Sequence, residues 1–149
     1  MKQALIAMIF LMLVSCRSAT EKWLDGLADF KELHGKTLSM EIMKVKPVST
    51  DTTALTYKVR IFPAKDWVDN QGRGQKTGLY YGVDSCFSLR SGKASFRPDM
   101  VQPVNNGIAG CFEYLISYEV TKAMKMKELQ LVYKDKFIDG KQYQMELNR

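Results

Sequence analysis

The stretch Phe112-Glu113-Tyr114-Leu115-Ile116-Ser117-Tyr118-Glu119-Val120 decides the fold. Every second residue in it is aromatic or a large aliphatic, so the apolar pattern repeats with a period of two. In a strand, successive side chains point to opposite faces, and a period of two therefore predicts a strand with one buried face. We expect this stretch to pack its aromatic row against the core.

The same period recurs through most of the chain from residue 37 onward. It predicts further strands at residues 38–42, 55–61, 79–89, 129–133 and 143–147, the 79–89 strand having a bend or bulge near Gly82 and Ser85. Turn-forming residues separate them at 47–53, 69–78, 91–93, 105–110 and 139–141. Strands without alternating helices predict a mainly β fold, and we expect an antiparallel immunoglobulin-like β-sandwich.

A short amphipathic helix is expected before the strands, near residues 19–34. Ser18 and Glu21 have the spacing of a capping box, and Trp23 begins an apolar row at helical spacing. His34 and Gly35 fit the end of such a helix, where a polar side chain suits the terminal carbonyls and Gly suits the next residue. The helix would either close one end of the core or lie on a membrane.

The amino terminus has the pattern of an export signal. Lys2 precedes an unbroken apolar run at residues 4–14. A helix of that length spans roughly 16 Å, about half of a hydrocarbon core near 30 Å thick. The run therefore predicts a cleavable signal rather than a membrane-spanning helix.

The end of that run, Leu13-Val14-Ser15-Cys16, resembles the lipobox of bacterial lipoproteins. The resemblance implies a signal peptide at residues 1–15, fatty acyl chains such as palmitate on Cys16, and a short tether at residues 16–20. Two or more chains hold a protein stably on a membrane. Residues 21–149 would then form a single domain, helix included. The alternative is an ordinary signal peptide followed by a coincidental Cys.

The residue after Cys16 and the net charge of the chain indicate where the protein is located. In the lipoproteins that the motif resembles, Asp after the Cys retains the protein in the inner membrane, and here Arg17 stands there, which implies the periplasmic side of the outer membrane. The chain carries a net charge of +6, and removal of residues 1–15 leaves +5. Anionic headgroups suit such a charge. Nucleic acid is not expected as a partner, because no basic stripe is interleaved with aromatics.

A second resemblance lies near the end of the chain. Residues 118–122, YEVTK, together with residues 127–135, KELQLVYKD, resemble the late strand, corner and strand of extracellular immunoglobulin-like domains in bacterial lipoproteins. Thr121 stands where that corner usually carries Pro. The resemblance implies the same sandwich fold.

Cys86 and Cys111 are the thiols that remain once the lipid takes Cys16. Their positions relative to the apolar rows of their strands allow both to face the same side, and exported proteins live where disulfides persist. We expect a Cys86–Cys111 bridge, with two reduced, buried thiols as the alternative.

Residue types limit the chemistry. The chain has one His, so a metal site rich in His and a Ser or Cys triad are not expected, and no cofactor is implied. Residues 72–76, GRGQK, lack the ending of a phosphate-binding loop. The long polar connection at residues 63–78 is a candidate functional segment. Carboxylates on or beside strands leave a small envelope hydrolase open as an alternative; they are Asp84, Asp99, Glu113 and Glu119.

Two groups of residues are candidates for membrane or partner contact. One is a basic corner of Lys122, Lys125 and Lys127, and the other is Lys22 with Trp23 beside the anchor. The aromatic row of residues 112–118, with Tyr80 and Tyr81, is either core or a recognition surface. We therefore expect a lipid-anchored, non-enzymatic binding or assembly module whose partner is another envelope protein. A small-ligand carrier or sensor in the sandwich is the first alternative.

Overall fold

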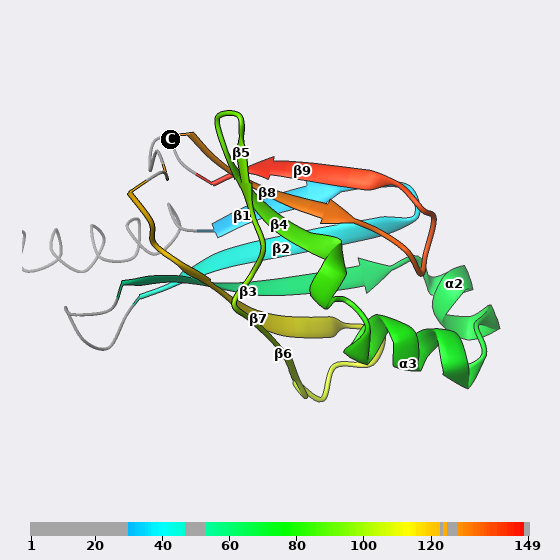
Figure 1. Ribbon diagram of the computed structural model, residues 1–149. Helices are drawn as coiled ribbons and strands as arrows, with labels where there is room; N and C mark the ends of the chain where they lie inside the picture. Colours follow the sequence, from blue (N-terminus) through cyan, green and yellow to red (C-terminus); the bar gives the residue numbers. More distant parts are fainter. Residues whose placement is uncertain (1–29, 47–52, 123, 125–127, 148–149) are drawn as a thin grey trace, which may run out of the picture. The chain divides into compact units, whose positions relative to one another are not determined.

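Most of the described chain lies in two antiparallel sheets (Figure 1). The computed structural model describes residues 30–46, 53–122, 124 and 128–147. The first sheet has the order β1-β2-β3-β7-β6, with β1 Phe30–His34, β2 Leu38–Val45, β3 Ala54–Pro63, β6 Met100–Val104 and β7 Phe112–Glu119. The second has the order β5-β4-β8-β9, with β4 Phe87–Ser91, β5 Ala94–Phe96, β8 Leu129–Lys134 and β9 Gln142–Glu146. The predicted mainly β fold is confirmed, and the two sheets are consistent with a β-sandwich.

Strand β7 has the burial pattern that its sequence predicts. Tyr114, Ile116 and Tyr118 expose 1% of their surface or less. Tyr114 lies opposite Val59 of β3, and Ile116 lies opposite Tyr57. The last residue of the alternating stretch, Val120, lies beyond the strand and is 37% exposed.

The buried rows of the two sheets form one core. Phe87 of β4 contacts Tyr133 of β8 with ring centroids 4.9 Å apart, and it contacts Tyr114 of β7 in the other sheet at 5.9 Å. Leu89 and Leu131 of the second sheet are fully buried in the same cluster. Burial of each large aliphatic or aromatic side chain stabilises the fold by about 1.5–3 kcal/mol.

The helix expected at residues 19–34 is wrong over its last five residues, which form strand β1. Residues 19–29 lie outside the described residues. Gly35, which suits a helix end, instead makes the tight turn to β2, where its N–H donates to the carbonyl of Leu38 at 2.9 Å. A Cβ on Gly35 would lie 2.6 Å from that oxygen, so this turn requires a glycine.

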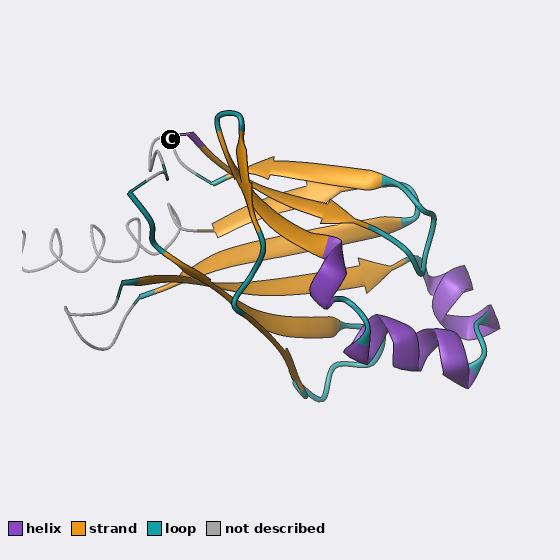
Figure 2. Ribbon diagram, viewed as in Figure 1, coloured by secondary structure: helices purple, strands orange, loops and turns teal. Residues whose placement is uncertain are grey.

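The long connection at residues 63–78 holds two helices instead of a loop (Figure 2). They are α2 Lys65–Asn70 and α3 Arg73–Tyr81, and a 3-10 turn, η1 Asp84–Cys86, leads into β4. The strand expected at residues 79–89 therefore begins only at Phe87. The helices gather at the end of the first sheet where β3 ends and β7 begins (Figures 1 and 2).

Tertiary contacts explain why α3 is helical in spite of two internal glycines. Leu79 is fully buried, and the Tyr114 hydroxyl donates to its carbonyl. The ring of Phe137 packs so closely that a Cβ on Gly78 would lie 2.9 Å from it, and one on Gly82 would lie 3.1 Å away. Gly78 lowers helix propensity, but Gly78 and the following Gly82 let this ring approach the helix.

Two strands lack a clear signal in the sequence. β5 has three residues, and β6 carries Pro103 at the edge of the first sheet, a position where a missing N–H is tolerated.

The pairing of the early strands differs from that of a constant-type immunoglobulin domain. β2 and β3 pair along eight residues within one sheet, whereas the second and third strands of a constant-type immunoglobulin domain lie in different sheets.

Candidate functional site

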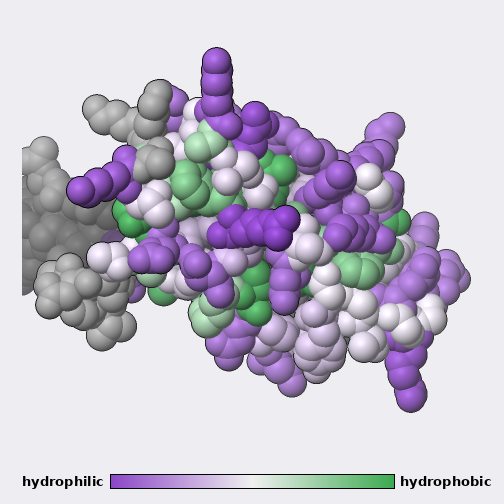
Figure 3. Space-filling view, viewed as in Figure 1, coloured by the Kyte–Doolittle hydropathy of each residue, from purple (hydrophilic) through white to green (hydrophobic). Residues whose placement is uncertain are grey.

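A hollow of about 400 Å³ lies along α3 and is called here the α3 pocket. It is lined by Arg73, Lys76, Thr77, Tyr80, Tyr81 and Asn105. Figure 3 shows projecting hydrophilic side chains at the α2 and α3 end of the molecule, beside paler residues of intermediate hydropathy. Three of these residues belong to the candidate functional segment at residues 63–78, and two are the tyrosines that follow it.

Helical spacing puts four of the lining residues on one face of α3. Arg73, Lys76, Thr77 and Tyr80 follow one another at i, i+3, i+4 and i+7. Leu79, next to this face, is buried in the core. The burial of Leu79 thus sets the direction in which both cations point.

Contacts to the first sheet hold α3 in place. The Tyr80 hydroxyl donates to the carbonyl of Val104 at 3.5 Å, and the Tyr80 ring meets Phe112 edge-on with centroids 5.7 Å apart. Tyr81 contacts the Tyr80 ring at 5.4 Å but leaves 69% of its surface exposed. One tyrosine therefore anchors the helix, and the other offers a ring to a ligand or partner.

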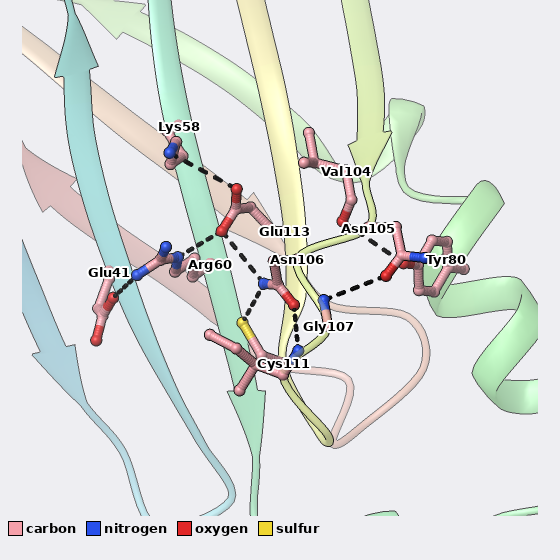
Figure 4. Close-up of polar contacts among 11 residues, drawn as sticks. Glu41, Lys58, Arg60, Tyr80, Val104, Asn105, Asn106, Gly107, Cys111 and Glu113 are labelled. Carbon is pink, nitrogen blue, oxygen red and sulfur yellow. Dashed lines mark hydrogen bonds and ion pairs between the residues drawn. The ribbon is translucent and has the colours of Figure 1, made fainter.

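The opposite wall of the pocket belongs to the loop between β6 and β7, which Asn106 holds together (Figure 4). The Asn106 amide donates to Glu113 Oε2 at 3.2 Å and to Cys111 Sγ at 3.0 Å. Its Oδ1 accepts the N–H of Ile108 at 2.9 Å. At the lining residue Asn105, Oδ1 accepts the N–H of Gly107 at 3.2 Å.

A row of charged side chains crosses the outer face of the first sheet beside this loop (Figure 4). Arg60 Nε donates to Glu113 Oε2 at 2.5 Å, and Arg60 Nη1 lies 3.4 Å from Glu41 Oε2. Lys58 Nζ lies 3.7 Å from Glu113 Oε1. Burial opposes ionisation of Glu113, yet the bonds from Arg60 and Asn106 hold its pKa below the usual value. The two acids and two bases of this row neutralise one another.

The cations of the α3 pocket have no such neutralisation. Neither Arg73 nor Lys76 forms an ion pair with a carboxylate in the part of the chain that the structure describes. The lining residues include no acid. The pocket therefore presents two positive charges on a well-anchored wall.

A second hollow, of about 460 Å³, lies over the outer face of the second sheet. Its lining mixes Asp84 with Arg97 and Lys134 and includes three serines, so it favours neither sign of charge strongly. Between the sheets, the apolar gap beside Leu33 and Tyr143 is too narrow to admit a water molecule. Of these three hollows, the α3 pocket is the one whose lining carries charge of one sign.

Most of the residues predicted for membrane or partner contact lie outside the described residues. These are Cys16, Lys22, Trp23, Lys125 and Lys127. Lys122 is described, and it lies exposed in the turn after β7. None of the helices within the described ranges is long and apolar enough to span a membrane.

The predicted disulfide is not formed, because Cys86 and Cys111 are both free and buried. Cys86 belongs to the core cluster between the sheets. Cys111 precedes β7 and accepts its hydrogen bond from the Asn106 amide, beside the charged row. Burial raises the pKa of both thiols above the ordinary value. The parity of the strands placed both thiols on one side, but η1 and the loop before β7 break that parity.

The candidate carboxylates do not converge. Glu113 belongs to the charged row, and Asp84 borders the second hollow. Asp99 accepts the backbone N–H of Glu119 at 2.6 Å, which is a structural contact between the start of β6 and the end of β7. Within the described segments, no three His, Cys, Asp or Glu side chains lie close enough together to hold a metal ion.

A buried Asp that the sequence analysis missed fixes the loop behind α3. Asp135 is 3% exposed and accepts backbone N–H groups from residues 137–140, with oxygen-to-nitrogen distances of 2.6 to 3.2 Å. This loop holds Phe137 against α3, and the Trp67 indole donates to the Phe137 carbonyl at 3.3 Å. An Asp at a strand end and a Gly at the far end of the loop, here Gly140 with its positive φ, are the signals that mark such a turn.

The chain matches no protein-family model, no curated protein sequence and no solved structure. The function proposed below therefore rests on the residues and the geometry of the chain itself.

Proposed function

We propose that this chain is a bacterial envelope lipoprotein that binds another envelope protein through the α3 pocket and does not act by catalysis. The lipobox residues Leu13-Val14-Ser15-Cys16 support the anchor. Acyl chains on Cys16 would hold the domain at the periplasmic side of the outer membrane, in agreement with Arg17 after the Cys.

The single observation that carries the binding function is the pair of unneutralised cations beside the exposed Tyr81. Tyr and Arg are enriched at protein interfaces and carry much of their binding energy. The Tyr81 ring is 69% exposed although it packs on Tyr80, which makes it an accessible aromatic surface that is already ordered. Ile108, in the loop between β6 and β7, is also exposed, at 49%.

The finer description of the fold also remains a proposal. The two sheets and the stretch from Tyr118 to Asp135 support kinship with immunoglobulin-like sandwiches of bacterial lipoproteins. The pairing of β2 with β3 in one sheet argues for a distinct strand order. We propose a two-sheet sandwich of this general kind, with its helices at the binding end.

Site-specific photo-crosslinking in growing bacteria tests the proposed function. A benzophenone amino acid would replace Tyr81, and in a control protein it would replace Met43, which is 40% exposed on β2. We expect a discrete protein adduct from position 81, none of that mass from position 43, and loss of the adduct when Cys16→Ala removes the anchor. Equal adducts from both positions, or none from position 81, would contradict the proposal.

A further inference from the structure

We propose that the α3 pocket receives a carboxylate-rich segment of the partner protein. This inference rests on the proposed function and names the chemistry of its partner. It commits to a peptide carrying Asp or Glu side chains, and lipid headgroups or free phosphate are outcomes of the test.

The pocket offers hydrogen-bond donors and positive charge from two walls. Arg73 and Lys76 supply a guanidinium and an ammonium group from α3. Across from them, Asn105 uses its Oδ1 to accept from Gly107, and its amide N–H groups have no partner among the described residues. A ligand that fills this space must bring acceptors and negative charge. Carboxylates supply both, and Arg binds them with two parallel hydrogen bonds.

The α3 pocket differs in charge balance from the charged row on the outer face of the first sheet. There, Arg60 and Lys58 are matched by Glu113 and Glu41 at 2.5 to 3.7 Å. In the pocket, two cations come within one helical turn of each other without an acid. Like charges on one helix face repel, so an anionic partner relieves a cost that the free protein carries.

An acidic peptide fits this surface better than a bare anion does. Tyr81 lines the pocket beside the cations and exposes an aromatic surface that phosphate leaves uncovered. A peptide segment places an acidic side chain in the pocket and packs a neighbouring side chain on the Tyr81 ring. Because Tyr80, Tyr114 and Asn106 already anchor both walls, little ordering is needed on binding.

Isothermal titration of the detergent-solubilised full chain tests the inference with defined probes. The first probe is an acetylated, amidated peptide with four glutamates around one tyrosine, and its matched control has four glutamines instead. Inorganic phosphate and phosphatidylglycerol vesicles are the other probes. We expect the glutamate peptide to bind, the glutamine peptide to bind at least about tenfold more weakly, and affinity to fall as salt rises.

Charge reversal locates the site. Arg73→Glu with Lys76→Glu should weaken the glutamate peptide by at least about tenfold. Lys44→Glu with Lys46→Glu makes the same change of charge at exposed positions at the end of β2 and should leave its affinity within about twofold. Unchanged unfolding midpoints in both double variants exclude misfolding as the cause.

Three results would overturn the inference. They are no binding of the glutamate peptide, equal loss in both double variants, and tighter binding of phosphate or vesicles in the pocket. If crosslinking from position 81 succeeds while the peptide does not bind, only the acidic partner is wrong. If both fail, the proposed function is wrong as well.

Discussion

Removal of one hydroxyl from Tyr114 should loosen the attachment of α3 to the core. Tyr114 is 1% exposed, and its hydroxyl donates to the carbonyl of Leu79, also fully buried. Tyr114→Phe leaves that carbonyl without its donor, and an orphaned buried polar group costs about 1–3 kcal/mol. We expect the free energy of unfolding to fall by about that amount.

Tyr118, on the same strand, provides a matched control. It is 0% exposed, and its hydroxyl has no hydrogen-bond partner among the described residues. Tyr118→Phe removes an unsatisfied buried group, so stability should stay unchanged or rise by about 1 kcal/mol. The two substitutions delete the same atom, four residues apart, but only Tyr114→Phe should lower the stability.

Guanidinium chloride unfolding of the purified protein, followed by tryptophan fluorescence and circular dichroism, measures both effects. An unchanged slope with a shifted midpoint would assign the effect to the native state. In thermal unfolding, 1 kcal/mol corresponds to roughly 3–6 °C for a chain of this size. Equal midpoints for Tyr114→Phe and Tyr118→Phe would refute the hydrogen-bond assignment on which the placement of α3 depends.

Three further predictions follow from other parts of the structure. Burial opposes ionisation of Asp139, but its hydrogen bonds lower its pKa from 3.8 to about 2. The ionised carboxylate therefore stabilises the fold above pH 4, and up to about 2 kcal/mol of that stability is lost between pH 4 and pH 2. Acid titrations should show this loss in the unchanged protein and not in Asp139→Asn. Gly78→Ala should destabilise the protein by about 1–3 kcal/mol because the added Cβ would clash with the Phe137 ring. Gly74→Ala has open space around it and should stabilise the protein by about 0.4–1 kcal/mol. Equal unfolding midpoints for the two variants would contradict this. Alkylation without reductant should modify Cys86 and Cys111 only after denaturation, and a mass showing neither modified would restore the bridge.

The strands of the core could be predicted because each buries one face. Residues 38–42, 55–61, 112–120 and 129–133 show a period of two, and the structure places strands over all of them except Val120. Burial of alternate side chains gives that period directly, without knowledge of neighbouring strands.

The elements that the sequence analysis missed depend on partners far away in the chain. Leu79 and Tyr81 fit the period of a strand, but the hydrogen bond from Tyr114 and the ring of Phe137 favour a helix. Gly35 marks either a helix end or a hairpin, and only the approach of Leu38 decides for the hairpin. The sequence analysis therefore selected the segment that carries the α3 pocket but misjudged its conformation.

The composition of the candidate site could be predicted from the sequence, but its contacts could not. The basic and tyrosine-rich character of residues 72–81 is visible in the sequence, and so is the possibility of a recognition surface. The pairing of Arg60 with Glu113 and the bracing of the loop by Asn106 arise from strand register. Strand register brings Arg60 and Lys58 to Glu113, whereas Arg73 and Lys76 lie on a helix and pair with no carboxylate among the described residues.

The affinity ratio between the two double variants shows whether the α3 pocket is the binding site. The measurement compares binding of the glutamate peptide by Arg73→Glu with Lys76→Glu and by Lys44→Glu with Lys46→Glu. A loss of at least about tenfold in the first pair alone is the predicted result. Equal affinities in the two double variants would contradict the assignment of binding to the α3 pocket.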